Sequence, residues 1–214
     1  MEVINIYEAG LMIAVRKAVG ILIQGGVVAY PTETFYALGV KYDLEASLSR
    51  LYDVKRRPPE KGTPLIIGER SALALLSTSV SRTAMSLMDK FWPGPLTLVV
   101  PALENISDYI TSGTHTVAVR IPGESFALRL AASAGFAITA TSANVSGEPP
   151  AEDAKTVKEY FDGVIDLIID GGKTPGDLPS TIVDTTVEPA QILREGAVKK
   201  EALSAAGIYA LSLK

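Results

Sequence analysis

Polar side chains stand at the edges of six apolar runs, and their types suit the binding of phosphate and carboxylate groups. They are Thr32 to Thr34, Lys55 to Arg57, Thr116 with Arg120, Thr141 to Gly147, Ser180 with Thr181, and Arg194. Arg and Lys bind such anions, and hydroxyl and amide groups complete the hydrogen bonds. No acid/base pair or nucleophile is evident. This favours adenylyl or phosphoryl transfer from ATP, because positioning and charge neutralisation can carry that chemistry.

Each group on its own also has a simpler structural explanation. A Lys-Arg-Arg cluster is often a solvated helix end, and a Ser-Ala-Asn-x-Ser-Gly segment suits a capped turn. The loops at the strand ends of an open α/β sheet, however, converge on one crevice. We therefore expect the six groups to meet in a single anion-binding site.

The common nucleotide and metal motifs do not occur in the sequence. The segment DGGKTPG ends like a P-loop, but Leu167 stands where the motif requires glycine, and Pro175 disfavours an immediate helix. No G-x-G-x-x-G occurs, and the single histidine, His115, argues against a Ser-His-Asp triad or a multi-histidine metal site. The lack of Cys excludes thiolate metal sites and cysteine nucleophiles.

Length and composition predict one cytoplasmic domain over residues 1–214. The chain is 47% hydrophobic, which is enough for a substantial core, and its lack of Cys suits a reducing compartment. No signal-peptide pattern or membrane-spanning apolar run is evident. A net charge of −4 argues against nucleic-acid binding over a broad surface, so any anion site must be local.

Hydrophobic spacing predicts an α/β fold with a mixed sheet that positions these groups. Residues 11–22 have helical spacing and end before Gly25, and Asp43 is the expected N-cap of a helix that carries Leu48 and Leu51. Further helices are expected at residues 81–91, 125–134, 153–161 and 199–207. Strands that alternate with the helices are expected at VVAY, PLII, LTLVVP, TVAVRI, FAITA, VIDLIID and STIVDTT.

Seven segments occur in an order that resembles a known family. They are YPTETFYALG, KRRP, FWPGPLTLVV, TVAVRIPGE, TSANVSG, PSTIVD and ILREG, between residues 25 and 196. Together they closely resemble the YrdC/TsaC family of threonylcarbamoyl-adenylate synthases. The resemblance implies a twisted mixed parallel and antiparallel α/β sheet, with flanking helices, around a basic cavity.

The resemblance also implies an activity and its partners. L-Threonine, bicarbonate or CO2, and ATP would give threonylcarbamoyl-AMP and pyrophosphate, with Mg²⁺ accompanying the nucleotide. The product supplies the threonylcarbamoyl group of N6-threonylcarbamoyladenosine in tRNA. In that family, downstream threonylcarbamoyl-transferase proteins deliver the group to tRNA. At most weak tRNA binding and no membrane association are therefore expected.

The family's motifs can be transferred residue by residue. Its K-x-R corresponds to Lys55 and Arg57, which would offset triphosphate charge as pyrophosphate leaves, and its S-x-N to Ser142 and Asn144. Arg120 suits a bidentate grip on a carboxylate. The residues implied around threonine are Thr34, Arg120, Ser142 and Ser180. The residues implied around ATP are Lys55, Arg57, Lys61, Thr116, Asn144 and Arg194.

Two features depart from the family pattern. The family often reads K-x-R-P-x-x-x-P-L-x-V-H, whereas KRRPPEKGTPLIIG is longer before Pro-Leu and has Gly68 in place of the histidine. Threonine contacts usually attributed to that histidine are therefore not transferred, and Lys61 is expected to approach the phosphates from the enlarged loop. The chain also resembles the short members of the family, which lack a C-terminal extension.

Two other functions remain open from the sequence. One is carbamoyl-adenylate chemistry, as in the YrdC-like domain of the hydrogenase-maturation protein HypF, although HypF also carries a zinc-finger region and this chain has no Cys. The other is a non-catalytic RNA-binding or ribosome-maturation module, which predicts salt-dependent RNA binding. Threonine-dependent release of pyrophosphate distinguishes the synthase from both.

Overall fold

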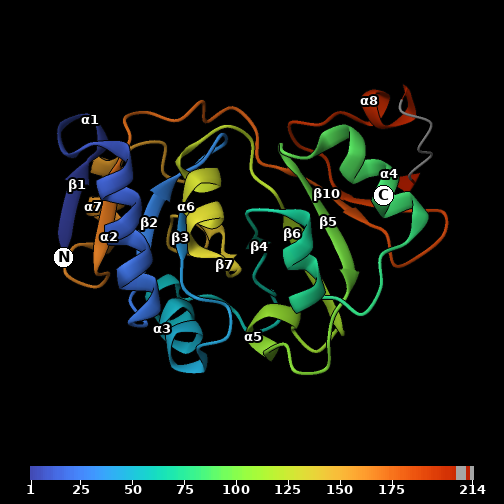
Figure 1. Cartoon of the computed structure of the whole chain (residues 1–214), viewed down its shortest axis with the longest axis horizontal. Coiled ribbons are helices and arrows are strands. Elements are labelled where there is room, and N and C mark those ends of the chain that lie inside the picture. Colours follow the sequence, from blue (N-terminus) through green and yellow to red (C-terminus); the bar gives the residue numbers. More distant parts are fainter. Residues whose placement is uncertain (206–210, 213–214) are drawn as a thin grey trace.

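The computed structural model describes residues 1–205 and 211–212, and in them the strands form two mixed sheets side by side (Figure 1). The five-stranded sheet has the order β1-β9-β2-β3-β8, and the seven-stranded sheet has the order β12-β11-β10-β5-β6-β4-β7. Each contains parallel and antiparallel pairs. The predicted mixed α/β fold is confirmed, but the strands divide between two sheets where one was expected.

The elements alternate along the chain as the sequence predicts, with several short additions. The strands are β1 (Glu2–Asn5), β2 (Val28–Pro31), β3 (Tyr36–Gly39), β4 (Leu65–Ile66), β5 (Leu96–Pro101), β6 (Thr116–Arg120), β7 (Ile138–Thr139), β8 (Thr141–Ser142), β9 (Leu167–Asp170), β10 (Thr181–Asp184), β11 (Gln191–Arg194) and β12 (Leu211–Ser212). The helices are α1 (Ile6–Ala9), α2 (Leu11–Ile23), α3 (Glu45–Lys55), η1 (Arg70–Leu75), α4 (Arg82–Phe91), α5 (Asp108–Thr111), α6 (Phe126–Ala134), α7 (Ala154–Phe161) and α8 (Lys200–Ala205).

Helix α2 packs beside α6 over the five-stranded sheet (Figure 1). Its buried residues are Ala14, Val15, Ala18 and Leu22, which recur at the spacing of one helix face. Full burial of a side chain such as Leu22 stabilises the fold by about 1.5–3 kcal/mol. The helix ends just before Gly25, whose φ of 83° lies in the left-handed region that glycine adopts without strain.

Helices α4 and α7 begin one residue after the predicted starts and have side-chain caps, whereas α3 lacks the cap predicted at Asp43. Ser81 and Asp153 each accept a hydrogen bond from the backbone N–H three residues on. Asp43, the expected cap of α3, instead accepts hydrogen bonds from Lys41 Nζ at 2.6 and 2.7 Å. Leu44 occupies the cap position without a side-chain hydrogen bond.

One large core joins the two sheets. It includes Leu38 of β3 and Ile168 of β9 from the five-stranded sheet, with Leu65, Leu98 and Val119 from strands β4, β5 and β6 of the other. All five side chains are fully buried. Loops at the facing edges of the sheets are therefore held by a shared, closely packed interior.

The C-terminal part of the described chain adds the edge strand of the seven-stranded sheet. Helix α8 confirms the helix expected near residue 199, although residues 206–207 of that expectation, and residues 213–214 of the tail, lie outside the described residues. Strand β12 pairs in parallel with β11. Among the described residues, no helix has the length and hydropathy needed to cross a membrane.

Candidate active site

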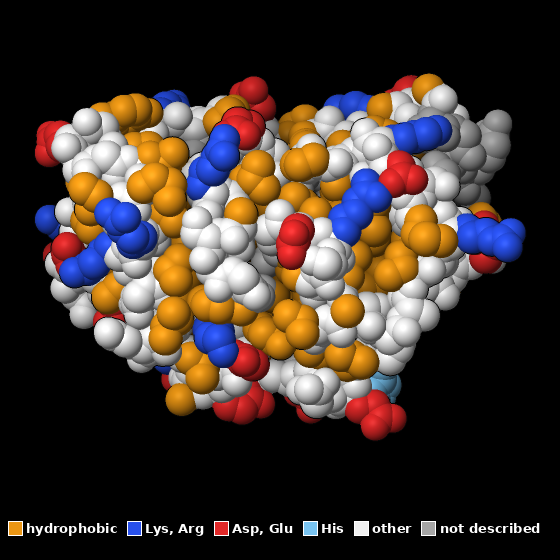
Figure 2. Space-filling model, in the orientation of Figure 1, with side chains coloured by type: hydrophobic (Ala, Val, Ile, Leu, Met, Phe, Trp, Pro, Cys, Tyr) orange, Lys and Arg blue, Asp and Glu red, His pale blue; other side chains and the backbone are white. Residues whose placement is uncertain are grey.

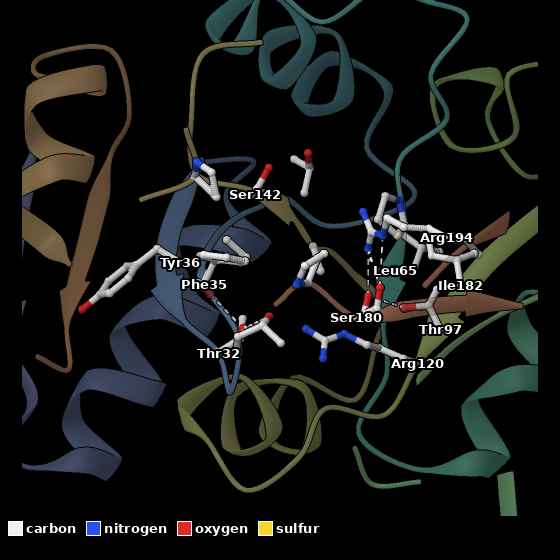
Figure 3. A pocket seen from close by; sticks show the side chains of 18 of the residues that line it. Thr32, Phe35, Tyr36, Leu65, Thr97, Arg120, Ser142, Ser180, Ile182 and Arg194 are labelled. Carbon is white, nitrogen blue, oxygen red and sulfur yellow. Dashed lines mark hydrogen bonds between the residues drawn. The ribbon is translucent and has the colours of Figure 1, made fainter. Parts of the chain in front are cut away.

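A cavity of about 440 Å³ is lined by residues of both sheets (Figure 3). Among the described residues, no Asp or Glu lines it. Its apolar wall includes Leu65, Ala118 and Ile182. Its polar lining consists of Thr32, Thr34, Arg57, Thr97, Arg120, Thr141, Ser142, Ser180 and Arg194. Three arginines and six hydroxyl-bearing residues therefore line one cavity, as an anion-binding site requires.

The cavity brings together six of the ten residues that the sequence singled out. These are Thr34, Arg57, Arg120, Ser142, Ser180 and Arg194. The other four are absent from its lining and are Lys55, Lys61, Thr116 and Asn144. The hydroxyls and arginines thus converge as expected, whereas the Lys55 side chain is buried against backbone carbonyls and the Lys61 side chain is exposed.

Two threonines fix the turn between β2 and β3. Thr32 Oγ1 donates to the carbonyl of Phe35 at 2.8 Å and accepts from the backbone N–H of Thr34 at 3.0 Å. The Thr34 hydroxyl shares a further hydrogen bond of 3.0 Å with Thr32 Oγ1. Such side-chain bonds within a turn replace the glycine or proline that a plain turn would use. The hydroxyls therefore have a structural role as well as facing the cavity.

Arg57 follows α3 and points into the cavity with neutral partners. The helix ends at Lys55, and Arg56, its C-cap, takes the left-handed conformation with φ of 50°. Arg57 Nε then donates to the carbonyl of Lys61 at 2.8 Å, Nη2 to the carbonyl of Gly62 at 2.6 Å, and Nη1 to Thr141 Oγ1 at 3.4 Å. Because none of these acceptors is charged, the guanidinium keeps its full positive charge toward the cavity.

Lys55 lies beneath the Thr-Ser-Ala-Asn segment and is only 1% exposed. Its Nζ donates to the carbonyl of Ser142 and, at 2.7 Å, to the carbonyl of Asn144. Burial, together with the nearby Arg57 guanidinium, lowers the pKa of Lys55 from its ordinary 10.5 to about 7. In this arrangement Lys55 stabilises the backbone of the Ser142–Asn144 segment. Its predicted contact with the phosphates of ATP stays a prediction.

Asn144 uses its amide within the same segment. Its Oδ1 accepts from Ser142 Oγ at 2.6 Å, and its Nδ2 donates to the carbonyls of Val145 at 3.0 Å and Glu148 at 2.7 Å. These bonds close the loop after β8 and leave the exposed Ser142 facing the cavity. The expected contact between Asn144 and the nucleotide also stays a prediction.

Strands β6, β10 and β11 supply the opposite wall. Arg194 Nη2 donates to the carbonyl of Ser180 at 2.8 Å and to its Oγ at 3.1 Å, and Ser180 Oγ shares a 2.9 Å hydrogen bond with Thr97 Oγ1. Burial and the neighbouring Arg120 lower the pKa of Arg194. Arg120 itself forms a salt bridge with Glu33. Arg194, Ser180 and Thr97 therefore form one hydrogen-bonded cluster on this wall, and Arg120 lies beside it with a separate partner (Figure 3).

The remaining predicted ATP residues, Lys61 and Thr116, have local roles. The Lys61 side chain is exposed, and its carbonyl accepts hydrogen bonds from Arg57 Nε and from the Tyr52 hydroxyl. Thr116 begins β6 and shares a 2.8 Å hydrogen bond with Thr114. Thr116 shares a strand face with the cavity residues Ala118 and Arg120, as alternation predicts. It lies at the start of β6, however, and does not line the cavity.

The backbone of α6 leaves no room for a histidine side chain at position 68, where this chain has glycine. A Cβ atom at this position would lie 2.4 Å from the Cα of Ala132, which belongs to α6. Real Cβ atoms do not approach a backbone so closely, so no side chain fits unless the helix moves. In this chain the position is used for close packing of the segment after β4 against α6.

Thr97 is a site residue that the sequence analysis missed. It lies in the otherwise apolar strand β5, is 2% exposed, and joins Ser180 in lining the cavity. The only signal was one hydroxyl inside LTLVVP, which a buried strand would equally tolerate with a backbone partner. Among the described residues, no group of three or more His, Cys, Asp or Glu side chains could hold a metal ion.

Comparison with known proteins identifies the family. Residues 20–196 match the family model named Sua5_yciO_yrdC, which is described as "Telomere recombination". The chain belongs to the Sua5/YciO/YrdC family. This confirms the family inferred from the seven ordered segments. The chain is also 39% identical over 199 residues to a Pyrococcus abyssi protein named threonylcarbamoyl-AMP synthase, across 93% of this chain and 58% of the relative.

Solved structures of the family agree with the fold. The structure of P. abyssi Sua5 complexed with L-threonine is similar to this chain with a TM-score of 0.93 and 37% identity, over 99% of this chain and 62% of that one. The chain thus spans less than two thirds of the length of these relatives. Full-length HypF in its phosphate- and nucleotide-bound form matches at 18% identity with a TM-score of 0.75, which shows the shared fold alone.

Proposed function

We propose that this member of the Sua5/YciO/YrdC family is a threonylcarbamoyl-AMP synthase. It would convert L-threonine, bicarbonate or CO2, and ATP into threonylcarbamoyl-AMP and pyrophosphate, and the product would serve the formation of N6-threonylcarbamoyladenosine in tRNA. The name of the P. abyssi relative and the threonine complex of its Sua5 support the proposal. The observation that carries it is the meeting of Arg57, Arg120 and Arg194 with six hydroxyls in one cavity.

The reaction balances in two steps. The unprotonated amine of threonine attacks the carbon of CO2 and loses a proton, which gives the N-carboxylate. An oxygen of that carboxylate then attacks the α-phosphorus of ATP, and the bond to the departing pyrophosphate breaks. Where bicarbonate is the source, one water is released as well. The second step needs neutralisation of phosphate charge and alignment rather than a protein nucleophile.

The cavity offers a group for each charge in that reaction. Arg57, which has only neutral partners, would meet the triphosphate and the leaving pyrophosphate. Arg120 would bind the threonine carboxylate, with the hydroxyls of Thr34, Ser142 and Ser180 around the rest of the amino acid. Arg194 would complete the nucleotide side. Each of these roles is part of the proposal.

The buried residues Lys55 and Asn144 would act on the substrates indirectly, by stabilising the loop that carries Ser142. Lys55 and Asn144 would keep the Ser142 loop in place through the hydrogen bonds described above, in addition to the family's expected contacts with ATP. Thr116 and Lys61 would reach the nucleotide only after a local rearrangement. Mg²⁺ would enter as the counter-ion of ATP, because this ion is commonly held by substrate phosphates and water.

The RNA-binding alternative predicts a different surface. In the face drawn in Figure 2, Lys and Arg side chains are scattered among acidic ones rather than gathered into one broad patch. A net charge of −4 agrees with that distribution. We therefore propose small-molecule substrates, with downstream transferases as the tRNA-binding partners and a reducing cytoplasm as the compartment.

A pyrophosphate-release assay tests the proposed function. The full chain is incubated with ATP and Mg²⁺, and L-threonine and bicarbonate are added singly and together. Release that requires both is the expected result. Release that needs bicarbonate but not threonine would favour carbamoyl-adenylate chemistry. No release, combined with RNA binding that weakens steeply with salt, would favour the RNA-binding module.

A further inference from the structure

Glu33 lies beside the cavity without lining it. Its neighbours Thr32 and Thr34 face the cavity, while the Glu33 carboxylate pairs with Nη1 of Arg120, 87 positions away in the sequence. Glu33 belongs to the β2–β3 turn of the five-stranded sheet, and Arg120 ends β6 of the seven-stranded sheet. The ion pair therefore connects the two sheets at the wall of the cavity.

This ion pair is largely withdrawn from water. The side chains of Arg120 and Glu33 are 8% and 16% exposed. Glu33 also packs closely against Gly123, where an added Cβ would lie 3.4 Å from the Glu33 Cγ. Removing either partner of a buried pair leaves an uncompensated charge. The two side chains therefore determine each other's position.

The second carboxylate oxygen of Glu33 points to a role beyond stability. Among the described residues, Glu33 Oε2 is the one buried side-chain nitrogen or oxygen atom without a hydrogen-bond partner. An unsatisfied buried carboxylate oxygen is unfavourable, and a packed apolar group would avoid that cost. Local departures of this kind are expected where a residue serves a functional site.

The pairing leaves one edge of the guanidinium available. Arg120 uses Nη1 for Glu33, and among residues 1–205 no hydrogen-bond acceptor contacts its Nε or Nη2. In Figure 3 the guanidinium points into the cavity toward Thr32. A carboxylate binds a guanidinium through two parallel N–H groups, and Nε with Nη2 forms one such pair. The free edge therefore has the geometry for a second carboxylate.

We infer that Glu33 is a positioning residue for the amino-acid substrate, because it holds Nη1 of Arg120 and so presents the Nε–Nη2 edge to the substrate carboxylate. The inference rests on the proposed function. Two effects of Glu33 oppose each other. Its charge weakens the attraction of Arg120 for an anion, and its hydrogen bond fixes the guanidinium. Among the lining arginines, only Arg120 has a carboxylate partner in the described chain.

Two substitutions separate the two effects of Glu33. Glu33→Ala removes both the acceptor and the charge, and we expect its KM for L-threonine to rise about 10–100-fold, as for other losses of substrate alignment. Glu33→Gln keeps an acceptor for Nη1, so its KM should stay within about threefold of wild type. Neither variant should change the KM for ATP or kcat by more than about threefold.

Glu124→Ala is the matched control. Glu124 follows the same strand and pairs with Arg129 on the exposed surface, so its loss should leave both KM values unchanged. A threonine KM in Glu33→Ala equal to that of wild type would overturn the inference. A lower KM would overturn it too, because Glu33 would then be a competitor for Arg120. If Glu33→Ala does not fold, Glu33→Asp shortens the carboxylate by one methylene and should raise the threonine KM in its place.

A second measurement needs no substrate. Phenylglyoxal modifies arginine, and peptide mass spectrometry reports its rate at Arg120 in each variant. We expect modification about tenfold faster in Glu33→Ala than in wild type, and little change in Glu33→Gln, because only the alanine variant frees the guanidinium. Equal rates would contradict the positioning role. This result stands even where wild type shows no threonine-dependent pyrophosphate release, an outcome that would refute the proposed function alone.

Discussion

The two walls of the cavity hold their arginines in different ways. The first wall, which we call the α3 side, comprises Arg57, Thr141 and Ser142, and the buried Lys55 and Asn144 support it without lining the cavity. Arg57 and Lys55 donate to backbone carbonyls and to one hydroxyl. The second, the β6 side, comprises Arg120, Ser180 and the adjoining Glu33, and here the arginine has a carboxylate partner. Arg194, which donates only to Ser180, has neutral partners like those of Arg57.

The difference matters because neutral acceptors leave a cation's charge intact, whereas a carboxylate offsets it. Arg57 on the α3 side therefore keeps its full charge, which suits the multiply charged triphosphate of the proposed reaction. The β6 side offers a partly neutralised guanidinium with a defined free edge, which suits the single charge of an amino-acid carboxylate. In the proposed function, the same residue type would thus be adapted to two different anions by its hydrogen-bond partners.

The largest expected effect concerns the β6 side, where hydroxyls would read the substrate hydroxyl. If Thr34 and Ser180 bind it, valine should be used about 10⁴-fold less well than threonine, because it leaves buried polar groups unpaired. Serine, which lacks only a methyl group, should lose about 10–200-fold in kcat/KM. Initial rates of pyrophosphate release at limiting amino acid measure both ratios. Equal use of valine and serine would show that the hydroxyl is not recognised.

The next effect concerns the α3 side, where Lys55 supports the Ser142 loop. Lys55→Met leaves the buried carbonyls of Ser142 and Asn144 without a donor, at about 1–3 kcal/mol each in the free energy of unfolding. Displacement of the loop should also reduce kcat/KM by about 10²-fold. Chemical denaturation and steady-state assays test the two parts. Lys158→Met, which alters an exposed lysine of α7, should change neither quantity.

A smaller effect is the pH dependence of stability that Lys55 contributes. Its pKa is about 7 in the folded chain and near 10.5 when unfolded, so between these values the unfolded chain binds more protons. Stability should therefore rise with pH in this window, by up to about 1.4 kcal/mol per unit. A neutral amine still has two N–H groups for the two carbonyls. Denaturation of wild type and Lys55→Met between pH 7 and 9.5 should give a steeper rise for wild type, and parallel curves would contradict the assignment.

The helices were predictable where residue type and hydrophobic spacing indicate the same element. Ser81 and Asp153 cap their helices, and Ala18 and Leu22 lie on the buried face that their spacing indicated. Asp43 failed as a cap because Lys41 competes for its carboxylate, a contact between neighbours that cap preference ignores. The division of strands between two sheets depends on long-range pairing, which periodicity does not encode.

The site was predictable in its residue types but not in its partners. Arg57, Arg120 and Ser180 stood out as polar residues at strand and helix ends, and the fold brings them together. Lys55 and Arg57 are both cations at the end of α3, and the sequence does not distinguish their roles. Lys55, however, lies on the buried face of α3 and donates to backbone carbonyls, which no sequence pattern indicates. Thr97 was missed because a lone threonine inside a strand has many structural uses.

The division of the cavity between phosphate and carboxylate is tested most directly by calorimetry on two variants. ATP with Mg²⁺ and L-threonine are each titrated into Arg57→Ala and Arg120→Ala, with Arg120→Lys used if the alanine variant does not fold. Arg57→Ala should weaken ATP binding about 10–150-fold and leave threonine binding within about threefold, and the Arg120 variant should show the reverse pattern. Equal losses of both ligands in both variants would contradict the division.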